Sequence, residues 1–224
     1  MKTTPERNSL EAPEPDAKPQ QKPRNRALKS MGELPGLILI AFILALLIKT
    51  FLFQAFYIPS GSMEPTLHGC TGCTGDRILV DKIPYYFHDP RRGDIIVFSD
   101  PHPTAQPDRG VVGGFFHWLF EGLGVQHPSN EDFVKRVIGL PGDTVWAKGG
   151  SVYVNGAKLN EPYLTQKTAD FPHTPVPKGE LFVMGDNRGD SLDSRFGLGF
   201  IPIRNVIGKA QIIIWPPSRF GLLH

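Results

Sequence analysis

The chain has 224 residues and a formal net charge of +2, with a pI of about 8.5. This charge is too small to indicate a nucleic-acid-binding protein. The length allows one substantial domain together with additional segments.

Residues 1–33 have the composition of a disordered tail. They are rich in Pro, Glu, Lys, Asn and Gln, and they contain too few aliphatic residues to form a packed core. Between Lys18 and Lys29 the tail carries five Lys/Arg residues and no acid. Because positive residues beside a membrane-spanning segment stay in the cytoplasm, we expect the N-terminus inside and residues beyond about 55 outside. Whether the basic residues also bind anionic lipid is left open.

An apolar segment follows this tail. Gly36–Ile48 is 13 residues of uninterrupted apolar sequence, and apolar character resumes after Lys49 at Phe51–Phe53. No small-x-small cleavage pattern follows. We therefore expect one transmembrane anchor over residues 34–57, with Lys49 reaching the headgroups and aromatic residues at the interface. A cleaved signal sequence or a buried core helix are the alternatives.

Two cysteines, Cys70 and Cys73, come soon after the anchor. A redox pair would need a βαβ setting, and a structural zinc site with His68 would need further ligands. Outside the cytoplasm a local disulfide is the favoured interpretation, with free thiols as the next alternative.

Residues 58–224 predict a mainly β domain. Short β-branched or aromatic runs are separated by turn residues, and Gly149-Gly150 and Asn155-Gly156 are hairpin signals. The expected strands are 77–80, 94–98, 133–138, 144–148, 151–154, 180–184 and 206–215. The absence of a βαβ rhythm favours an antiparallel, barrel-like domain.

Residues 104–130 read as an insertion within this domain. Their ends are rich in Gly and Pro, and their middle is the aromatic run Phe115–Phe120. The aromatic side chains are expected either to pack on the domain or to enter the membrane interface.

Ser62, just beyond the apolar segment, is a candidate nucleophile. A serine needs a base, but the seven histidines are scattered through loops and the C-terminus. The Gly-x-Ser-x-Gly elbow is missing as well, because position 60 is Ser and position 64 is Glu. A histidine-based triad is therefore disfavoured.

Lys135 is the candidate base. In a strand over 133–138, Lys135 shares the apolar face of Phe133 and Val137, whereas Arg136 faces the other way. A lysine on an apolar face is destabilising unless its amine is neutral or paired, and a lowered pKa would make it a base. A surface lysine reaching solvent is the alternative.

The polar segment Met184–Arg195 follows a predicted strand. It lacks the spacing of a calcium loop. It can be a solvated loop, or an ordered one in which Asp193 pairs with Arg195 and Ser191 donates a hydrogen bond to a base.

Four motifs in this order resemble bacterial type I signal peptidases. They are Pro-Ser-Gly-Ser-Met-x-Pro-Thr-Leu at 59–67, Gly-Asp-Ile-Ile-Val-Phe at 93–98, Lys-Arg-Val-Ile-Gly-Leu-Pro-Gly-Asp at 135–143, and Gly-Asp-Asn-Arg with Ser-x-Asp-Ser-Arg at 185–195. The resemblance covers most of the domain beyond the apolar segment.

The resemblance implies the signal peptidase fold and a membrane-bound endopeptidase with a Ser/Lys dyad. It assigns Ser62 as the acyl-forming nucleophile and Lys135 as the general base. Ser60 and the backbone N–H of Ser62 would stabilise the oxyanion, Ser191 would orient the lysine, and Asp193 and Arg195 would brace the site.

The same resemblance implies cleavage of exported preproteins after small residues, with Met63 as a candidate to line the first substrate pocket and to touch the membrane surface. The implied partners are signal peptides and membrane lipid, with no nucleic acid, no cofactor and no metal; a monomer is the default expectation. The alternatives are a self-cleaving repressor-type Ser/Lys protease, a non-catalytic anchored domain that binds exported chains, and an anchored disulfide enzyme.

Overall fold

The computed structural model describes residues 26–70, 72, 74–102 and 132–223. The expected insertion at 104–130 and most of the expected tail lie outside these residues. Helix α1 spans Arg26–Phe51 and contains Pro35. The chain divides into two units between Ile43 and Leu44, within this helix.

The N-terminal boundaries differ from those expected. The helix begins at Arg26, so the last basic residues of the predicted tail belong to it. Residues 53–57, predicted as the end of the anchor, form the strand β1 because Phe53–Tyr57 pairs with Arg77–Asp81. Within the described residues no helix combines the length and the apolar character needed to cross a membrane.

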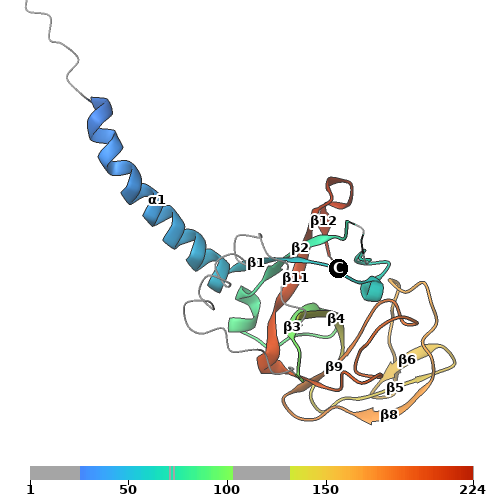
Figure 1. Ribbon diagram of the computed structural model, residues 1–224. Helices are drawn as coiled ribbons and strands as arrows, with labels where there is room; N and C mark the ends of the chain where they lie inside the picture. Colours follow the sequence, from blue (N-terminus) through green and yellow to red (C-terminus); the bar gives the residue numbers. More distant parts are fainter. Residues whose placement is uncertain (1–25, 71, 73, 103–131, 224) are drawn as a thin grey trace, which may run out of the picture. The chain divides into compact units, whose positions relative to one another are not determined.

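The second unit is built on an antiparallel sheet with the order β1-β2-β11-β3-β4-β9-β10, and β12 pairs with β11 (Figure 1). Its strands are β1 Phe53–Tyr57, β2 Arg77–Asp81, β3 Ile95–Ser99, β4 Asp132–Gly139, β9 Glu180–Met184, β10 Ile201–Pro202, β11 Val206–Trp215 and β12 Gly221–Leu222. Four short 3-10 helices join them: η1 Gly61–Met63, η2 Ile83–Tyr86, η3 Ile203–Asn205 and η4 Pro217–Arg219.

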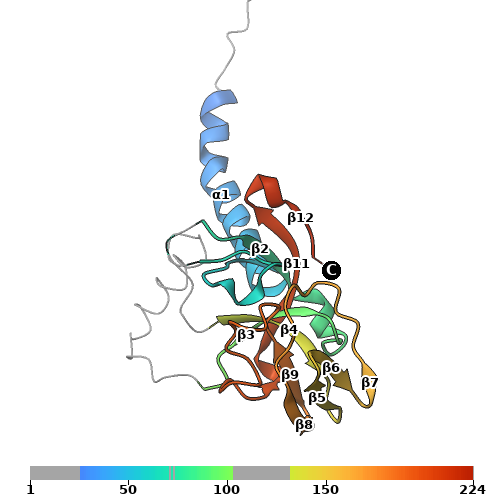
Figure 2. The same cartoon turned by 90° about the vertical axis from the view of Figure 1, so that its right-hand side faces the viewer.

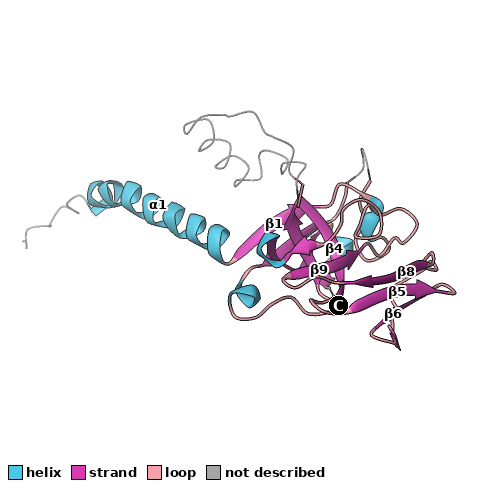
Figure 3. Cartoon of the chain, turned by 90° about the horizontal axis from the view of Figure 1, so that it is seen from below, coloured by secondary structure: helices cyan, strands magenta, loops and turns pink. Residues whose placement is uncertain are grey.

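A smaller antiparallel sheet has the order β7-β6-β5-β8. Its strands are β5 Thr144–Lys148, β6 Ser151–Val154, β7 Ala157–Lys158 and β8 Phe171–Pro175, which form their own group beside β4 and β9 (Figure 3). The predicted hairpin turns are confirmed: Gly149, Gly150, Asn155 and Gly156 all have positive φ, as tight hairpin turns require.

The antiparallel, mainly β prediction is confirmed, but the expected barrel does not close. The edge strands β1 and β10 lie at opposite ends of the large sheet, and no pairing between them occurs among the described strands. Since β10 has only two residues, it offers little backbone with which to pair a second neighbour.

The hydrophobic core explains why β3 and β4 can hold functional groups rigidly. The side chains of β3 alternate between two clusters: Ile95 and Val97 pack in one, and Ile96 and Phe98 pack in the other. The strand is thus buried on both faces. Burial of a large apolar side chain contributes about 1.5–3 kcal/mol, so the neighbouring β4 is held by a well-packed strand.

Candidate active site

Ser62 lies in η1, directly after β1 and an extended connection. Its backbone carbonyl accepts a hydrogen bond from the Asn187 N–H at 3.1 Å, and the Gly61 carbonyl accepts one from Asn187 Nδ2 at 3.0 Å. Asn187 follows β9, so a loop from the far side of the large sheet fixes the turn that presents the serine.

Lys135 is on β4, opposite Ile96 of β3. Its Nζ lies 2.7 Å from Ser62 Oγ and 3.1 Å from the Val134 carbonyl oxygen, and only 3% of the residue is exposed. The predicted strand face is confirmed, because Phe133 and Val137 both contribute to the same hydrophobic cluster.

Burial lowers the pKa of Lys135 from 10.5 to about 8, although the carboxylates of Asp193 and Asp186 act in the opposite direction. The amine can therefore lose its proton near neutral pH. A serine hydroxyl in hydrogen-bond contact with such an amine is an arrangement able to perform acyl transfer.

Ser60 lies beside the same hydroxyl. Its Oγ is 3.3 Å from Ser62 Oγ, in an exposed position. A second hydroxyl at this distance from the nucleophile can donate a hydrogen bond to negative charge that develops next to Ser62.

Asp193 and Arg195 form a buried ion pair, as expected. Arg195 Nε donates to Asp193 Oδ1 at 2.9 Å and Nη2 donates to Oδ2 at 2.8 Å. Asp193 also accepts the Gly185 N–H at 3.0 Å, and Arg195 Nη2 reaches the Arg188 carbonyl at 3.1 Å. The pair therefore closes the loop 185–195 on itself.

Ser191 differs from expectation. Its Oγ is buried and has no hydrogen-bond partner among the described residues, so the predicted bond to Lys135 is not formed. The hydroxyl lies against Gly185, where an added Cβ would overlap both Ser191 Oγ and the Ser62 carbonyl oxygen. Ser191 is thus packed beside the nucleophile turn, whereas the Lys135 amine bonds to Ser62 and Val134.

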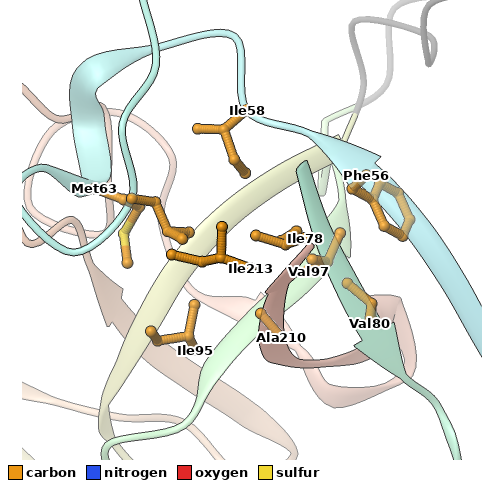
Figure 4. Close-up of a cluster of buried hydrophobic side chains, with 10 residues drawn as sticks. Phe56, Ile58, Met63, Ile78, Val80, Ile95, Val97, Ala210 and Ile213 are labelled. Carbon is orange, nitrogen blue, oxygen red and sulfur yellow. The ribbon is translucent and has the colours of Figure 1, made fainter. Parts of the chain in front are cut away.

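Met63 is buried, whereas it was predicted to touch the membrane surface; its place in the first substrate pocket stays a prediction. It is only 1% exposed and points into a cluster with Ile58 and Ile213 (Figure 4). The residue next to the nucleophile is thus part of the core. It therefore does not touch a membrane surface in this structure.

Cys70 is disulfide-bonded. Cys73, the other cysteine of the chain, lies outside the described residues. Among the described residues no group of three or more His, Cys, Asp or Glu side chains could hold a metal ion.

A buried network, not predicted from the sequence, joins the two parts of the site. Arg136 donates to Asp186 through Nε at 2.9 Å and Nη2 at 2.7 Å, and Thr66 Oγ1 donates to the same carboxylate. Arg136 is 2% exposed and Asp186 is 1% exposed. Asp186 thereby connects β4, which carries Lys135, to the segment that carries Ser62. The sequence feature that could have predicted this network is Asp186 in the Gly-Asp-Asn-Arg motif, which was not assigned a role.

A second layer of this network comes from the loop between β7 and β8. The Arg136 guanidinium stacks 3.9 Å above the Tyr163 ring. Tyr163 donates its hydroxyl to Glu161, which also pairs with Arg188. Burial, together with the Glu161 carboxylate, raises the pKa of Tyr163, so its phenol stays a hydrogen-bond donor.

Comparison with known proteins identifies the family. The model of the family described as "Signal peptidase, peptidase S26" matches residues 31–215. The probable signal peptidase I of Mycobacterium leprae is 40% identical over 235 residues, which cover 89% of this chain and 80% of that protein. Signal peptidase I of Leptolyngbya laminosa is 42% identical over 218 residues, which cover 95% of each.

A crystal structure of a signal peptidase I from Enterococcus faecalis is 30% identical and covers 55% of this chain and 97% of that one, with a TM-score of 0.39. The chain belongs to the signal peptidases of peptidase family S26, and it is a serine endopeptidase.

Proposed function

We propose that this peptidase removes N-terminal signal peptides from exported preproteins, cutting after small residues through a Ser62/Lys135 dyad and an acyl-enzyme. The observation that supports the dyad is the 2.7 Å approach of Lys135 Nζ to Ser62 Oγ in a buried site. The substrate class is that named by the relatives of the chain.

In the proposed reaction, Ser62 Oγ attacks the carbonyl carbon of the scissile bond while the neutral Lys135 amine takes the hydroxyl proton. The resulting oxyanion accepts hydrogen bonds from the Ser60 hydroxyl and the Ser62 backbone N–H. Removal of one such donor lowers kcat about 100- to 1000-fold in a well-studied protease.

The tetrahedral intermediate then collapses. The C–N bond breaks, the leaving amine takes the proton from Lys135, and the cleaved signal peptide stays attached to Ser62 as an ester. Water next attacks this ester while Lys135 again accepts a proton, and the peptide acid and the free Ser62 hydroxyl are regenerated.

The test is cleavage of a preprotein with an Ala-x-Ala junction, in detergent micelles, by the wild type, Ser62→Ala and Lys135→Ala. We expect the wild type alone to cut at that junction. Cleavage that survives both substitutions would place the chemistry elsewhere, and folded but inactive wild type would favour a domain that only binds exported chains.

We also propose that the N-terminal segment, of which the exposed apolar residues of α1 are a part, anchors the chain at the plasma membrane, with the N-terminus cytoplasmic and the catalytic unit outside. Apolar side chains of the helix are exposed at many successive positions. They include Leu37, Ile38, Leu39, Ile40, Ile43, Leu44, Leu47 and Ile48. Five Lys/Arg residues between 18 and 29 give the orientation.

Membrane association is tested by alkaline extraction of membranes from cells that express the full chain, with protease protection to read the orientation. We expect the protein in the membrane pellet. Replacement of Ile43 and Leu44 by Lys should release it, because charges within the hydrocarbon region are strongly unfavourable. Wild type in the soluble fraction would contradict the proposal.

A further inference from the structure

Asp76 holds both ends of the chain segment that carries the nucleophile. The Ile58 N–H donates to the Asp76 carbonyl at 2.9 Å, and the Asp76 N–H donates to the His68 carbonyl at 2.8 Å. The Asp76 carboxylate in turn accepts the His68 N–H at 2.8 Å. Residues 58–68, which we call the serine segment, are therefore a loop closed on one residue that is 1% exposed.

Arg219, near the C-terminal end of the chain, binds both Asp76 and the serine segment. Its Nε lies 3.0 Å and 3.2 Å from the two carboxylate oxygens of Asp76. Its Nη2 donates to the Thr66 carbonyl within the serine segment at 3.0 Å. A buried carboxylate needs such a partner, because without one its charge is strongly destabilising.

The C-terminal residues are folded back so that Arg219 can reach this position. Gly221 and Leu222 of β12 pair with Ile213 and Ile212 of β11, next to which β12 runs in Figure 2. The Leu223 N–H then donates to the Gln211 carbonyl at 2.8 Å, and Leu223 packs against the cluster that contains Met63. The last turn, η4, is thus held at a fixed place beside the serine segment.

The guanidinium geometry suits this double contact. Its N–H groups form a rigid planar fork, so one side can bind the carboxylate while another reaches a carbonyl oxygen. A lysine amine carries the same charge but presents it as a single point on a flexible stem. A lysine at this position can form an ion pair with Asp76, but it cannot at the same time bind the Thr66 carbonyl with the geometry of the guanidinium.

We propose that Arg219 is a positioning residue for Ser62. By neutralising Asp76 and binding the Thr66 carbonyl, it holds the serine segment in the register that sets Ser62 Oγ against Lys135. The expected effect on cleavage rests on the proposed function. The expected effect on the serine segment rests only on the contacts of Arg219 with Asp76 and Thr66.

The experiment compares Arg219→Gln and Arg219→Lys with the wild type by two readouts, kcat and KM on the Ala-x-Ala preprotein and hydrogen exchange of peptides from residues 58–68. The matched control is Lys209→Gln. Lys209 forms an ion pair with Asp94 whose exposure, 35% and 8%, resembles the 30% and 1% of Arg219 and Asp76, but neither residue lies in the serine segment.

We expect Arg219→Gln to lower kcat about 10- to 100-fold with KM within about threefold, because small displacements of reacting groups have effects of this size. Arg219→Lys should recover part of that loss. Exchange in 58–68 should accelerate in Arg219→Gln and stay unchanged in Lys209→Gln, with similar melting temperatures for both variants.

Unchanged exchange in 58–68 together with kcat within twofold of wild type would overturn the positioning role. A loss of kcat in Arg219→Gln that is matched by the control, with a matched drop in melting temperature, would also overturn it in favour of general stability. If the wild type itself does not cut, the proposed function fails. Hydrogen exchange of residues 58–68 then still tests whether Arg219 holds the serine segment in place.

Discussion

The Lys135 amine is buried against Ser62, and burial lowers its pKa from 10.5 to about 8. The dyad needs the neutral form, so we expect kcat/KM to rise about tenfold between pH 7 and pH 9 and then to level off. The measurement is a pH profile on a substrate whose own groups do not titrate in this range. A profile that is flat across pH 7–9 would contradict the base assignment.

The same reasoning predicts that Lys135→Arg is as inactive as Lys135→Ala. A guanidinium does not lose its proton in a protein, so it supplies charge but no base. Single-turnover cleavage by both variants is the measurement. Residual activity in the arginine variant well above that of the alanine variant would mean that positive charge, rather than proton transfer, is what the site requires.

Gly185 sits where the nucleophile turn and the loop after β9 touch. A Cβ there would overlap the Ser62 carbonyl and the Ser191 hydroxyl, so we expect Gly185→Ala to lower kcat at least about 100-fold. Removing the Ser191 hydroxyl in a Gly185→Ala/Ser191→Gly variant should not restore activity, because the Ser62 carbonyl still blocks the site. Gly36→Ala, which meets no atom within 4 Å, is the control.

Among individual residues, those in motifs were predictable and their local contacts were not. The residue pattern made Ser62 and Lys135 candidates for nucleophile and base, and the resemblance to signal peptidases assigned them these roles. The Ser191 hydrogen bond was expected by resemblance, yet its hydroxyl meets no partner in the part of the chain that the structure describes. For Arg136 only the strand face of its side chain was predicted, because strand spacing does not reveal that the side chain pairs with Asp186.

At the scale of elements, the Arg136–Asp186 ion pair joins β4 to the loop that follows β9. Both side chains are at most 2% exposed, so Asp186→Asn removes the charge of a buried carboxylate that pairs with the guanidinium. We expect a loss of about 3–5 kcal/mol in the free energy of unfolding, measured by urea denaturation.

The double variant Arg136→Met/Asp186→Leu provides the check on this interpretation. It removes both charges while retaining apolar volume, so it should recover much of the stability lost in Asp186→Asn. If the double variant is less stable than the single one, the neighbouring contacts of Thr66 and Tyr163 contribute more than the ion pair does.

Strands with a clear pattern were predicted almost to the residue, including β5, β6, β9 and β11. β1 was missed because Phe53–Tyr57 continues the aromatic and apolar composition of the helix, and only its pairing with β2 makes it a strand. β8 was missed because it contains two prolines, and it owes its conformation to β5. In both cases distant backbone partners override a weak local signal.

For the whole molecule, Lys135 couples folding to pH. Below pH 8 the amine is protonated in both folded and unfolded chains, and its burial is fully destabilising. Between pH 8 and 10.5 the folded chain has released the proton while the unfolded chain still binds it, so stability rises with pH. At about 1.4 kcal/mol per pKa unit, the full rise is about 3.5 kcal/mol.

This linkage is measured as the difference in unfolding free energy between the wild type and Lys135→Met, at pH 7 and at pH 10. Other lysines titrate in both proteins and cancel. We expect the free energy of unfolding of the wild type to increase relative to that of the variant as the pH rises. A difference that is independent of pH would mean that the amine keeps an ordinary pKa when folded.

The pairing of β1 with β2 has a mechanical consequence. β1 is the only covalent route from α1 to Ser62, and its five residues are all paired with β2. A pull on the chain N-terminal to β1 therefore acts on this ladder first, with its backbone hydrogen bonds sharing the force. The serine turn lies beyond the ladder and bears no tension until those bonds give way. With the proposed membrane attachment, force on the N-terminal helix would be borne first by this strand pairing, upstream of the nucleophile.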